Sequence, residues 1–160
     1  MIDLILAIKF IHVLFAAAMF GTWLGIAGFM LLAYRSGNPS VVALVAQFAV
    51  RLELFVVAPA LALQPISGFP LAWAIGLTPL NEYWIDVALI LYVAVVAAWL
   101  VSLRIEIGLR NMARQAALGR GTLADNYPTL FRIWFALATI ILAAMIAIIL
   151  LMVWQPRLDY

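Results

Sequence analysis

Long apolar stretches separated by short polar segments dominate the hydrophobic pattern of this chain. Four of these stretches are long enough to cross a bilayer, because a transmembrane helix needs about 20 predominantly apolar residues. We expect the four spans at residues 4–33, 41–63, 83–103 and 130–154. The pattern therefore predicts an all-α polytopic membrane protein, a four-transmembrane-helix bundle that forms one integral membrane domain over residues 1–160.

Two of the connections between spans differ in composition. The apolar segment Gln64–Glu82 contains three prolines and no basic residue, and we expect it at the outer membrane interface with a short helical turn near Leu71–Ile75. The connection between spans three and four is basic, with Arg104, Arg110, Arg114 and Arg120. Its first half reads as a helical extension of span three that stops at Gly119.

The arginines also predict the orientation of the chain. Basic residues concentrate in cytoplasmic loops, so Arg35 and the basic connection are expected in the cytoplasm. Four spans then place both termini and the segment 64–82 on the periplasmic side. The first apolar run is too long for a cleavable signal peptide and reads as an uncleaved span.

Composition narrows the function classes. The 160 residues are 69% hydrophobic and 10% charged, whereas soluble domains are about half apolar and a quarter charged. The absence of cysteine excludes disulfides, thiolate metal sites and cysteine catalysis, and one histidine excludes a histidine-rich metal cluster within one chain. The net charge of +2 gives no indication of nucleic-acid binding, and the lipid bilayer is the expected partner.

The first span carries the only histidine, His12, in its outer half. An ionisable side chain inside a membrane is costly and marks a candidate functional site, although a structural hydrogen bond to a neighbouring helix is an equal alternative. Lys9 lies one turn earlier and flanks the same face, or extends to the interface. The His12 face continues through Ala16, Met19, Trp23, Ile26 and Met30.

The opposite face of the first span carries Gly21, Gly25 and Gly28. Small residues at this spacing let another helix approach closely. We expect this face to pack either against another span of the chain or against a second protomer.

Further charged residues are candidates for partners or binding groups. Asp86 enters span three at a depth similar to Lys9 and His12, where it either pairs with them or helps to start the helix. Arg51 and Glu53 project to nearly opposite sides of span two, so each needs a partner on another helix. Arg104 and Arg132 could reach Glu53. An ion pair within the bundle and a site for an anionic group are both consistent with this pattern.

A membrane bundle with an inward histidine can hold haem b, because cofactor sites in bundles form from facing side chains. His12 is the expected axial ligand, Lys9 and Asp86 its tuning or proton-relay groups, and Arg51 or Arg132 the partner of a propionate. Copper is an alternative metal, with His12 and methionines as ligands. Met152, and more deeply Met145, lie at a suitable depth on the fourth span.

Several motifs resemble a known family. The run Lys9-Phe10-Ile11-His12-Val13-Leu14, the run Gly21-Thr22-Trp23-Leu24-Gly25, the run from Tyr127 to Phe135 and the closing Gln155-Pro156 resemble a bacterial inner-membrane family catalogued as domain of unknown function 2269. The likeness covers nearly the whole chain. It implies an inner-membrane protein and carries no assigned activity.

A more distant likeness concerns the Lys9-x-x-His12 opening, which resembles the four-helix membrane protoporphyrinogen IX oxidase, a haem b protein, and the membrane domain of copper-resistance protein D. The resemblance implies that Lys9 and His12 lie near a haem. The chain departs from the oxidase pattern in span three, where a lysine is expected two residues after the tryptophan. Here Trp84 is followed by Asp86.

Two hypotheses follow. The first is a haem-b-binding, redox-type membrane protein that uses His12. The second is a non-enzymatic small-ligand or metal permease, or an accessory subunit of a larger membrane complex. The sequence does not decide whether the protein is an enzyme, and a homo-oligomer is consistent with either hypothesis.

Overall fold

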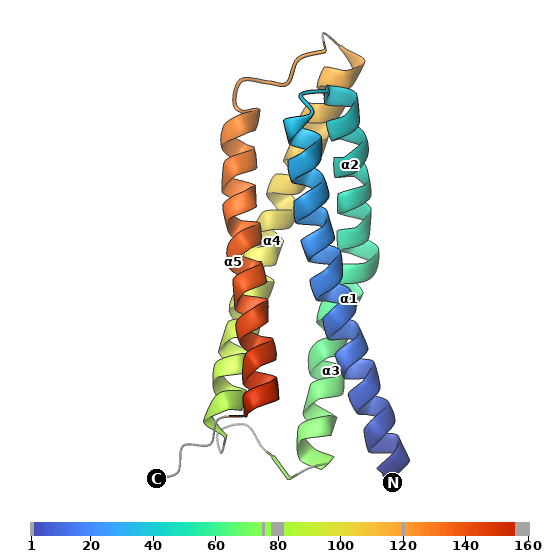
Figure 1. The fold of residues 1–160 in the computed structure, drawn as a ribbon, viewed down its shortest axis with the longest axis vertical. Coiled ribbons are helices and arrows are strands. Elements are labelled where there is room, and N and C mark those ends of the chain that lie inside the picture. Colours follow the sequence, from blue (N-terminus) through green and yellow to red (C-terminus); the bar gives the residue numbers. More distant parts are fainter. Residues whose placement is uncertain (1, 75, 78–81, 120, 156–160) are drawn as a thin grey trace.

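The computed structural model describes residues 2–74, 76–77, 82–119 and 121–155, and all regular structure in these ranges is helical. The elements are α1 (Ile2–Arg35), α2 (Pro39–Leu52), the π-helical turn η1 (Glu53–Val57), α3 (Ala58–Ala74), α4 (Tyr83–Leu118) and α5 (Tyr127–Trp154). Because α2, η1 and α3 follow one another without a break, the chain forms four long antiparallel helices (Figure 1).

All four helices are long and apolar enough to cross a membrane, which confirms the predicted architecture. Their lengths of 34, 36, 36 and 28 residues correspond to about 42–54 Å at 1.5 Å per residue, more than the roughly 30 Å of a hydrocarbon core. Helices of this length either tilt or extend beyond the bilayer.

The second membrane helix is longer than the sequence predicted. We expected it to end at residue 63, but α3 continues to Ala74 through Pro65 and Pro70. Pro65 cannot donate a hydrogen bond to the carbonyl of Leu61. The hydroxyl of Tyr92 donates to that carbonyl instead, at 2.5 Å. Because this carbonyl is hydrogen-bonded, Pro65 destabilises the helix less than an unsatisfied carbonyl would. The helix includes the first four residues of the turn expected at 71–75. Residue 75 lies outside the described residues.

The π turn lies immediately before Pro59. Pro59 lacks a backbone N–H, and its ring clashes with the carbonyl four residues earlier in a regular α-helix. The turn immediately before it is widened, and the N–H of Ala58 donates to the carbonyl of Glu53, five residues back. Such π turns are frequent at functional sites.

The end of α4 agrees with the prediction, whereas α5 begins three residues before the expected start of the fourth span at residue 130. α4 extends past the expected span to Leu118 and stops at Gly119, while α5 starts after Asn126 with a proline in its first turn. Of the basic connection, Arg120 lies outside the described residues.

Two packed clusters of side chains form the core. One surrounds Met30, Leu109, Tyr127 and Trp134, near the connections 36–38 and 119–126, and we call this the arginine end. The other surrounds Met19, Trp23, Trp99 and Met145, closer to the terminal end, where α1 starts and α5 stops (Figure 1). Towards the terminal end α3 packs mainly on α1, whereas α4 packs on α5. The bundle there consists of two helix pairs with few contacts between α3 and the other pair.

The glycine face of α1 does not pack within the chain. A Cβ atom added at Gly21, Gly25 or Gly28 would meet no atom within 4 Å. The expectation that another span of the chain covers this face is therefore wrong, and the expectation of a second protomer stays a prediction. The face predicted from His12 to Met30 is the inward one, since Met19, Trp23, Ile26 and Met30 are buried.

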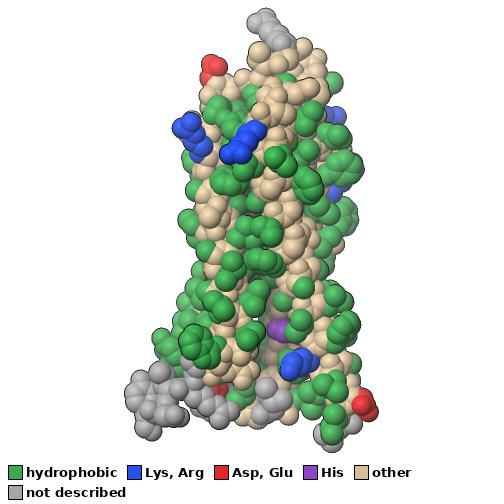
Figure 2. Space-filling model, viewed as in Figure 1, with side chains coloured by type: hydrophobic (Ala, Val, Ile, Leu, Met, Phe, Trp, Pro, Cys, Tyr) green, Lys and Arg blue, Asp and Glu red, His purple; other side chains and the backbone are tan. Residues whose placement is uncertain are grey.

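The surface of the bundle is apolar along most of its length (Figure 2). Large hydrophobic side chains are exposed on every long helix, as expected of side chains that face lipid. Basic side chains gather towards the arginine end in the same view.

Candidate functional site

A buried carboxylate, Glu53, occupies the middle of the bundle. Its side chain is 2% exposed, and its Oε2 atom accepts two indole hydrogen bonds. The Nε1–H of Trp99 donates at 2.6 Å and that of Trp23 at 3.1 Å. Three helices therefore meet at one carboxylate oxygen: α1 through Trp23, α4 through Trp99, and the second membrane helix through η1.

The partners of Glu53 differ from those suggested by the sequence. Arg104 and Arg132 were candidates, but both are exposed on the outside of the bundle. The periodicity of α1 predicted that Trp23 faces inward, so this partner of Glu53 could have been found from the sequence. Nothing in the sequence related Trp99 to Glu53, because the two residues are 46 positions apart and meet only when α4 packs on the second membrane helix.

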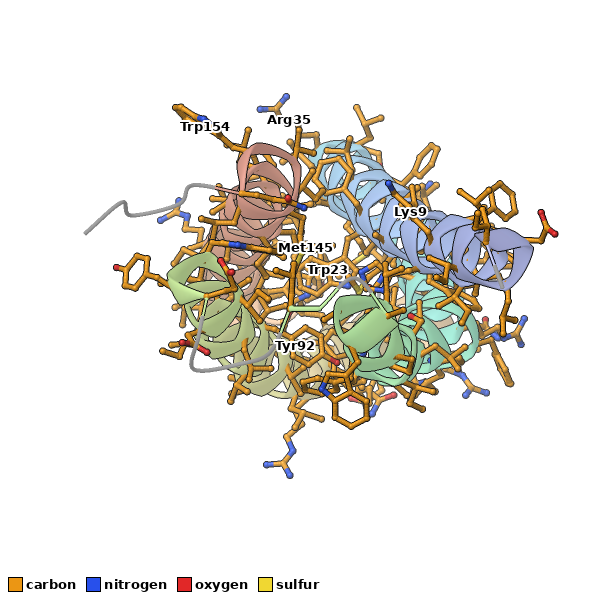
Figure 3. The ribbon with its side chains drawn as sticks, turned by 90° about the horizontal axis from the view of Figure 1, so that it is seen from below. Lys9, Trp23, Arg35, Tyr92, Met145 and Trp154 are labelled. Carbon is orange, nitrogen blue, oxygen red and sulfur yellow. The ribbon has the colours of Figure 1, made fainter. Side chains whose placement is uncertain are left out.

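A narrow apolar pocket adjoins the Glu53 site on the terminal side. The pocket contains about 160 Å³ of space between side chains, and no point in it admits a sphere the size of water. Its walls combine two indole rings, two thioethers and four aliphatic side chains: Trp23, Trp99, Met19, Met145, Val57, Leu61, Val95 and Ile141. Figure 3 shows Trp23 and Met145 directed towards the centre of the bundle, whereas Arg35 and Trp154 point away from it.

His12 lies between α1 and α3, nearer the terminal end. Its Nδ1 atom is 2.9 Å from the hydroxyl oxygen of Ser67, and the side-chain amide of Gln64 donates to the His12 carbonyl at 3.3 Å. The ring lies directly against Gly68, where an added Cβ would be 3.2 Å from Cε1. The imidazole is half-buried, and the absence of a side chain at Gly68 makes room for it.

The expected companions of His12 are distributed differently. The structure brings Gln64 against His12 and adds Ser67. Sequence reasoning missed Ser67 because residues 64–82 were expected at the outer interface, with only a short helical turn near Leu71–Ile75. Lys9 is exposed on α1. Asp86 lies in the first turn of α4, partly buried, where a carboxylate complements the helix dipole.

The remaining candidates for haem or metal binding lie apart from His12. Arg51 is exposed, with its guanidinium 5.8 Å from the ring centre of Phe48. It precedes Gln64, the neighbour of His12, by 13 residues, or about 20 Å along the helix. Arg132 is exposed, and Met152 is 40% exposed on α5. Among the described residues, no three His, Cys, Asp or Glu side chains are placed to hold a metal ion.

The haem and metal sites expected from the sequence stay predictions. The pocket beside Glu53 is smaller than the roughly 300–1,000 Å³ of typical ligand and cofactor sites, whereas a hollow of about 490 Å³ lies beside Ser67, the neighbour of His12. The arginines expected at the propionates are exposed on the outside, and Arg51 lies far along the helix from the imidazole. One feature does suit a metal ligand, since the Nδ1 of His12 is held by Ser67 and Nε2 is the atom left for a ligand.

A second buried carboxylate, Glu106, lies closer to the arginine end. It is 0% exposed, and among the described residues neither of its oxygens has a hydrogen bond of ordinary length, although the indole of Trp134 lies close enough to interact with the carboxyl. Arg110 lies one turn along α4, but its guanidinium donates to the side-chain oxygen of Asn111. Two acids thus lie in the core of a membrane bundle, where ionisable groups are rare and usually functional.

Four membrane-length helices, a lipid-facing apolar surface and buried acids in the core define a multi-pass integral membrane protein. A family model described as "Predicted integral membrane protein (DUF2269)" matches residues 6–156, so the chain belongs to this family. No curated protein and no solved structure matches the chain. The family expected from the sequence is confirmed, whereas the likeness to the porphyrinogen oxidase and the copper-resistance protein stays a prediction.

Proposed function

We propose that this integral membrane protein is a permease for small organic cations, with Glu53 as the cation-binding carboxylate. The observation that supports this function best is the position of Glu53. Its carboxylate is buried at the centre of the bundle, is held by Trp23 and Trp99, and adjoins a pocket lined by their rings.

The chemistry of the site favours a monovalent organic cation. An uncompensated carboxylate in a membrane core is costly, so Glu53 must carry a proton or a bound cation. The two indole N–H groups hold one oxygen in place, and the faces of indole rings attract alkylammonium ions. Aliphatic and thioether side chains complete the pocket and match the apolar part of such an ion. Binding of the cation and of the proton would exclude each other.

Access to the site would require the helices to move, because the pocket is too narrow to admit an ion as it stands. The construction of the bundle suggests how. Near the terminal end the α1–α3 and α4–α5 pairs share few contacts, and Tyr92 hydrogen-bonds across them to Leu61. Glu53 begins the π turn that joins α2 to α3, so a hinge at this turn would open the pocket towards the terminal end.

The location proposed for the protein is the bacterial inner membrane. By the positive-inside rule the arginine end faces the cytoplasm, and both termini face the periplasm. The pocket then opens towards the periplasmic side, where His12 lies on the same half of the bundle.

Binding of tetramethylammonium to the purified protein in detergent tests the proposal. Calorimetry is combined with a pH-sensitive dye in weak buffer. The wild-type protein is expected to bind the cation and release a proton, and Glu53→Gln is expected to do neither. Glu82→Gln is the matched control, because it removes an acid next to α4 and leaves the core intact. Equal binding by Glu53→Gln and the wild type would contradict the proposal.

The same preparation distinguishes the other hypotheses. Haemin that gives a Soret band in the wild type and none in His12→Ala would favour the haem protein. Copper or zinc that binds the wild type and binds His12→Ala more weakly would favour a metal permease. An accessory subunit would bind none of these ligands.

A further inference from the structure

A row of buried polar side chains leads from Glu53 towards the arginine end along one face of α4. Trp99, which donates to Glu53, is followed on this face by Ser102 and Glu106. The spacing of three and then four residues keeps them on one side of a helix. From Trp99 to Glu106 the helix rises by seven residue steps, or about 10 Å.

Among the described residues, the polar atoms of this row beyond Trp99 have no hydrogen bond of ordinary length. The hydroxyl of Ser102 and both carboxyl oxygens of Glu106 are buried in this way, and so are Nε1 of Trp134 and the hydroxyl of Tyr127 on α5, although the Trp134 indole lies close enough to Glu106 to interact with it. Burial of a polar group without a hydrogen bond costs free energy, so native proteins satisfy such groups, commonly with buried water. Hydroxyl and indole donors beside a carboxyl acceptor are the groups that bridging water molecules need.

The charged and titratable groups around Glu106 come from three sides. Glu53 interacts with it electrostatically from the second membrane helix, and Arg110 does so from the next turn of α4. The indole of Trp134 approaches Glu106 from α5, the helix packed against α4. Two negative charges at Glu53 and Glu106 would repel each other, so a proton lost by Glu53 is favoured at Glu106.

We propose that Ser102 and Glu106, joined by buried water, form a proton path between Glu53 and the arginine end. This inference rests on the proposed function. When the cation binds, the O–H bond of the Glu53 carboxyl breaks, and its proton passes through water and the Ser102 hydroxyl. Glu106 releases its own proton towards the arginine end and, as a carboxylate, accepts this one in a new O–H bond, so that one proton leaves for each cation bound. The cation and the proton therefore use opposite ends of the bundle.

The rate of proton release after rapid mixing with tetramethylammonium tests this path. Glu106→Gln should keep the affinity for the cation and the amount of proton released at equilibrium, but release should slow by at least about tenfold. Ser102→Ala should slow it less, because water can replace a hydroxyl. Glu82→Gln is the control and should release protons at the wild-type rate.

The outcomes separate the two proposals. A wild-type protein that neither binds the cation nor releases a proton refutes the proposed function itself. Proton release at the wild-type rate in both Glu106→Gln and Ser102→Ala overturns the path alone. Loss of cation binding in a folded Glu106→Gln also overturns it, because Glu106 would then be part of the binding site. If Glu106→Gln does not fold, the rate of proton release is compared in two other variants. These are Glu106→Asp, which retains a carboxyl, and Ser102→Ala.

Discussion

The hydrogen bond between Trp99 and Glu53 is predicted to stabilise the bundle measurably, and Trp99→Phe removes it while keeping an aromatic ring. The donor–acceptor distance of 2.6 Å is short for an N–H···O bond and is the shorter of the two indole contacts. The substitution leaves the Glu53 carboxylate with Trp23 as its one remaining donor.

The size of the effect follows from the protonation of Glu53 and from its surroundings. Without a bound cation Glu53 carries a proton, and a hydrogen bond between neutral groups contributes about 0.5–1.5 kcal/mol in proteins. Hydrogen bonds between membrane helices average about 0.6 kcal/mol and reach about 1.7, because the unfolded chain also finds partners in the membrane. We therefore expect about 1 kcal/mol for the pair. The Trp23 bond, at 3.1 Å, should contribute less.

The measurement is a double-mutant cycle with Trp99→Phe, with Glu53→Leu, which removes the acceptor, and with the double variant. The free energy of unfolding is followed by circular dichroism as SDS is added to mixed micelles. The cycle cancels the loss of packing that comes with the smaller ring. Trp23→Phe in an equivalent cycle is the comparison. Independent substitutions add within roughly 0.3–0.5 kcal/mol, so a coupling free energy no larger than this would refute the assignment of Glu53 and Trp99 as a strong pair.

Two other substitutions test the packing of α3. Gly68→Ala should destabilise the bundle and displace the His12 ring, because the new Cβ would lie 3.2 Å from the Cε1 atom of that ring. Gly25→Ala is the comparison: its new Cβ would have no atom within 4 Å, so this variant should be neutral or stabilising by up to about 1 kcal/mol. Unfolding free energies and the histidine NMR signal of the two variants check this, and equal effects would contradict it. Tyr92→Phe should cost about 1–2 kcal/mol, because the buried Leu61 carbonyl loses the donor that replaces Pro65; an unchanged unfolding free energy would show that the carbonyl finds another donor.

The errors in the sequence interpretation have physical causes. The second span was ended at residue 63 because prolines usually terminate helices. The helix continues because Tyr92, on another helix, satisfies the carbonyl that Pro65 leaves free, and no local pattern contains that information. The glycines of α1 were expected to pack either against another span of the chain or against a second protomer, because small residues indicate only that a close approach is possible.

The candidate site was predicted only in part. Periodicity placed Met19 and Trp23 on the inward face of α1, because burial follows the helical repeat. Glu53 was recognised as a buried charge that needs a partner on another helix. Its actual partners, two indoles, were not recognised, since tryptophan in a membrane helix is also found as an apolar or an interfacial side chain without a carboxylate partner.

The sequence by itself determined the class of the molecule: apolar stretches of this length can satisfy their backbone groups in lipid only as helices, and four of them make a four-helix membrane protein. The tertiary structure alone decided which polar groups meet. Trp99, Ser67 and Tyr92 are ordinary residues in their own helices, and each acquires its role from a neighbouring helix that covers it. Packing between helices depends on which faces come together, and this placed Glu53 and Glu106, rather than His12, at the centre of the bundle.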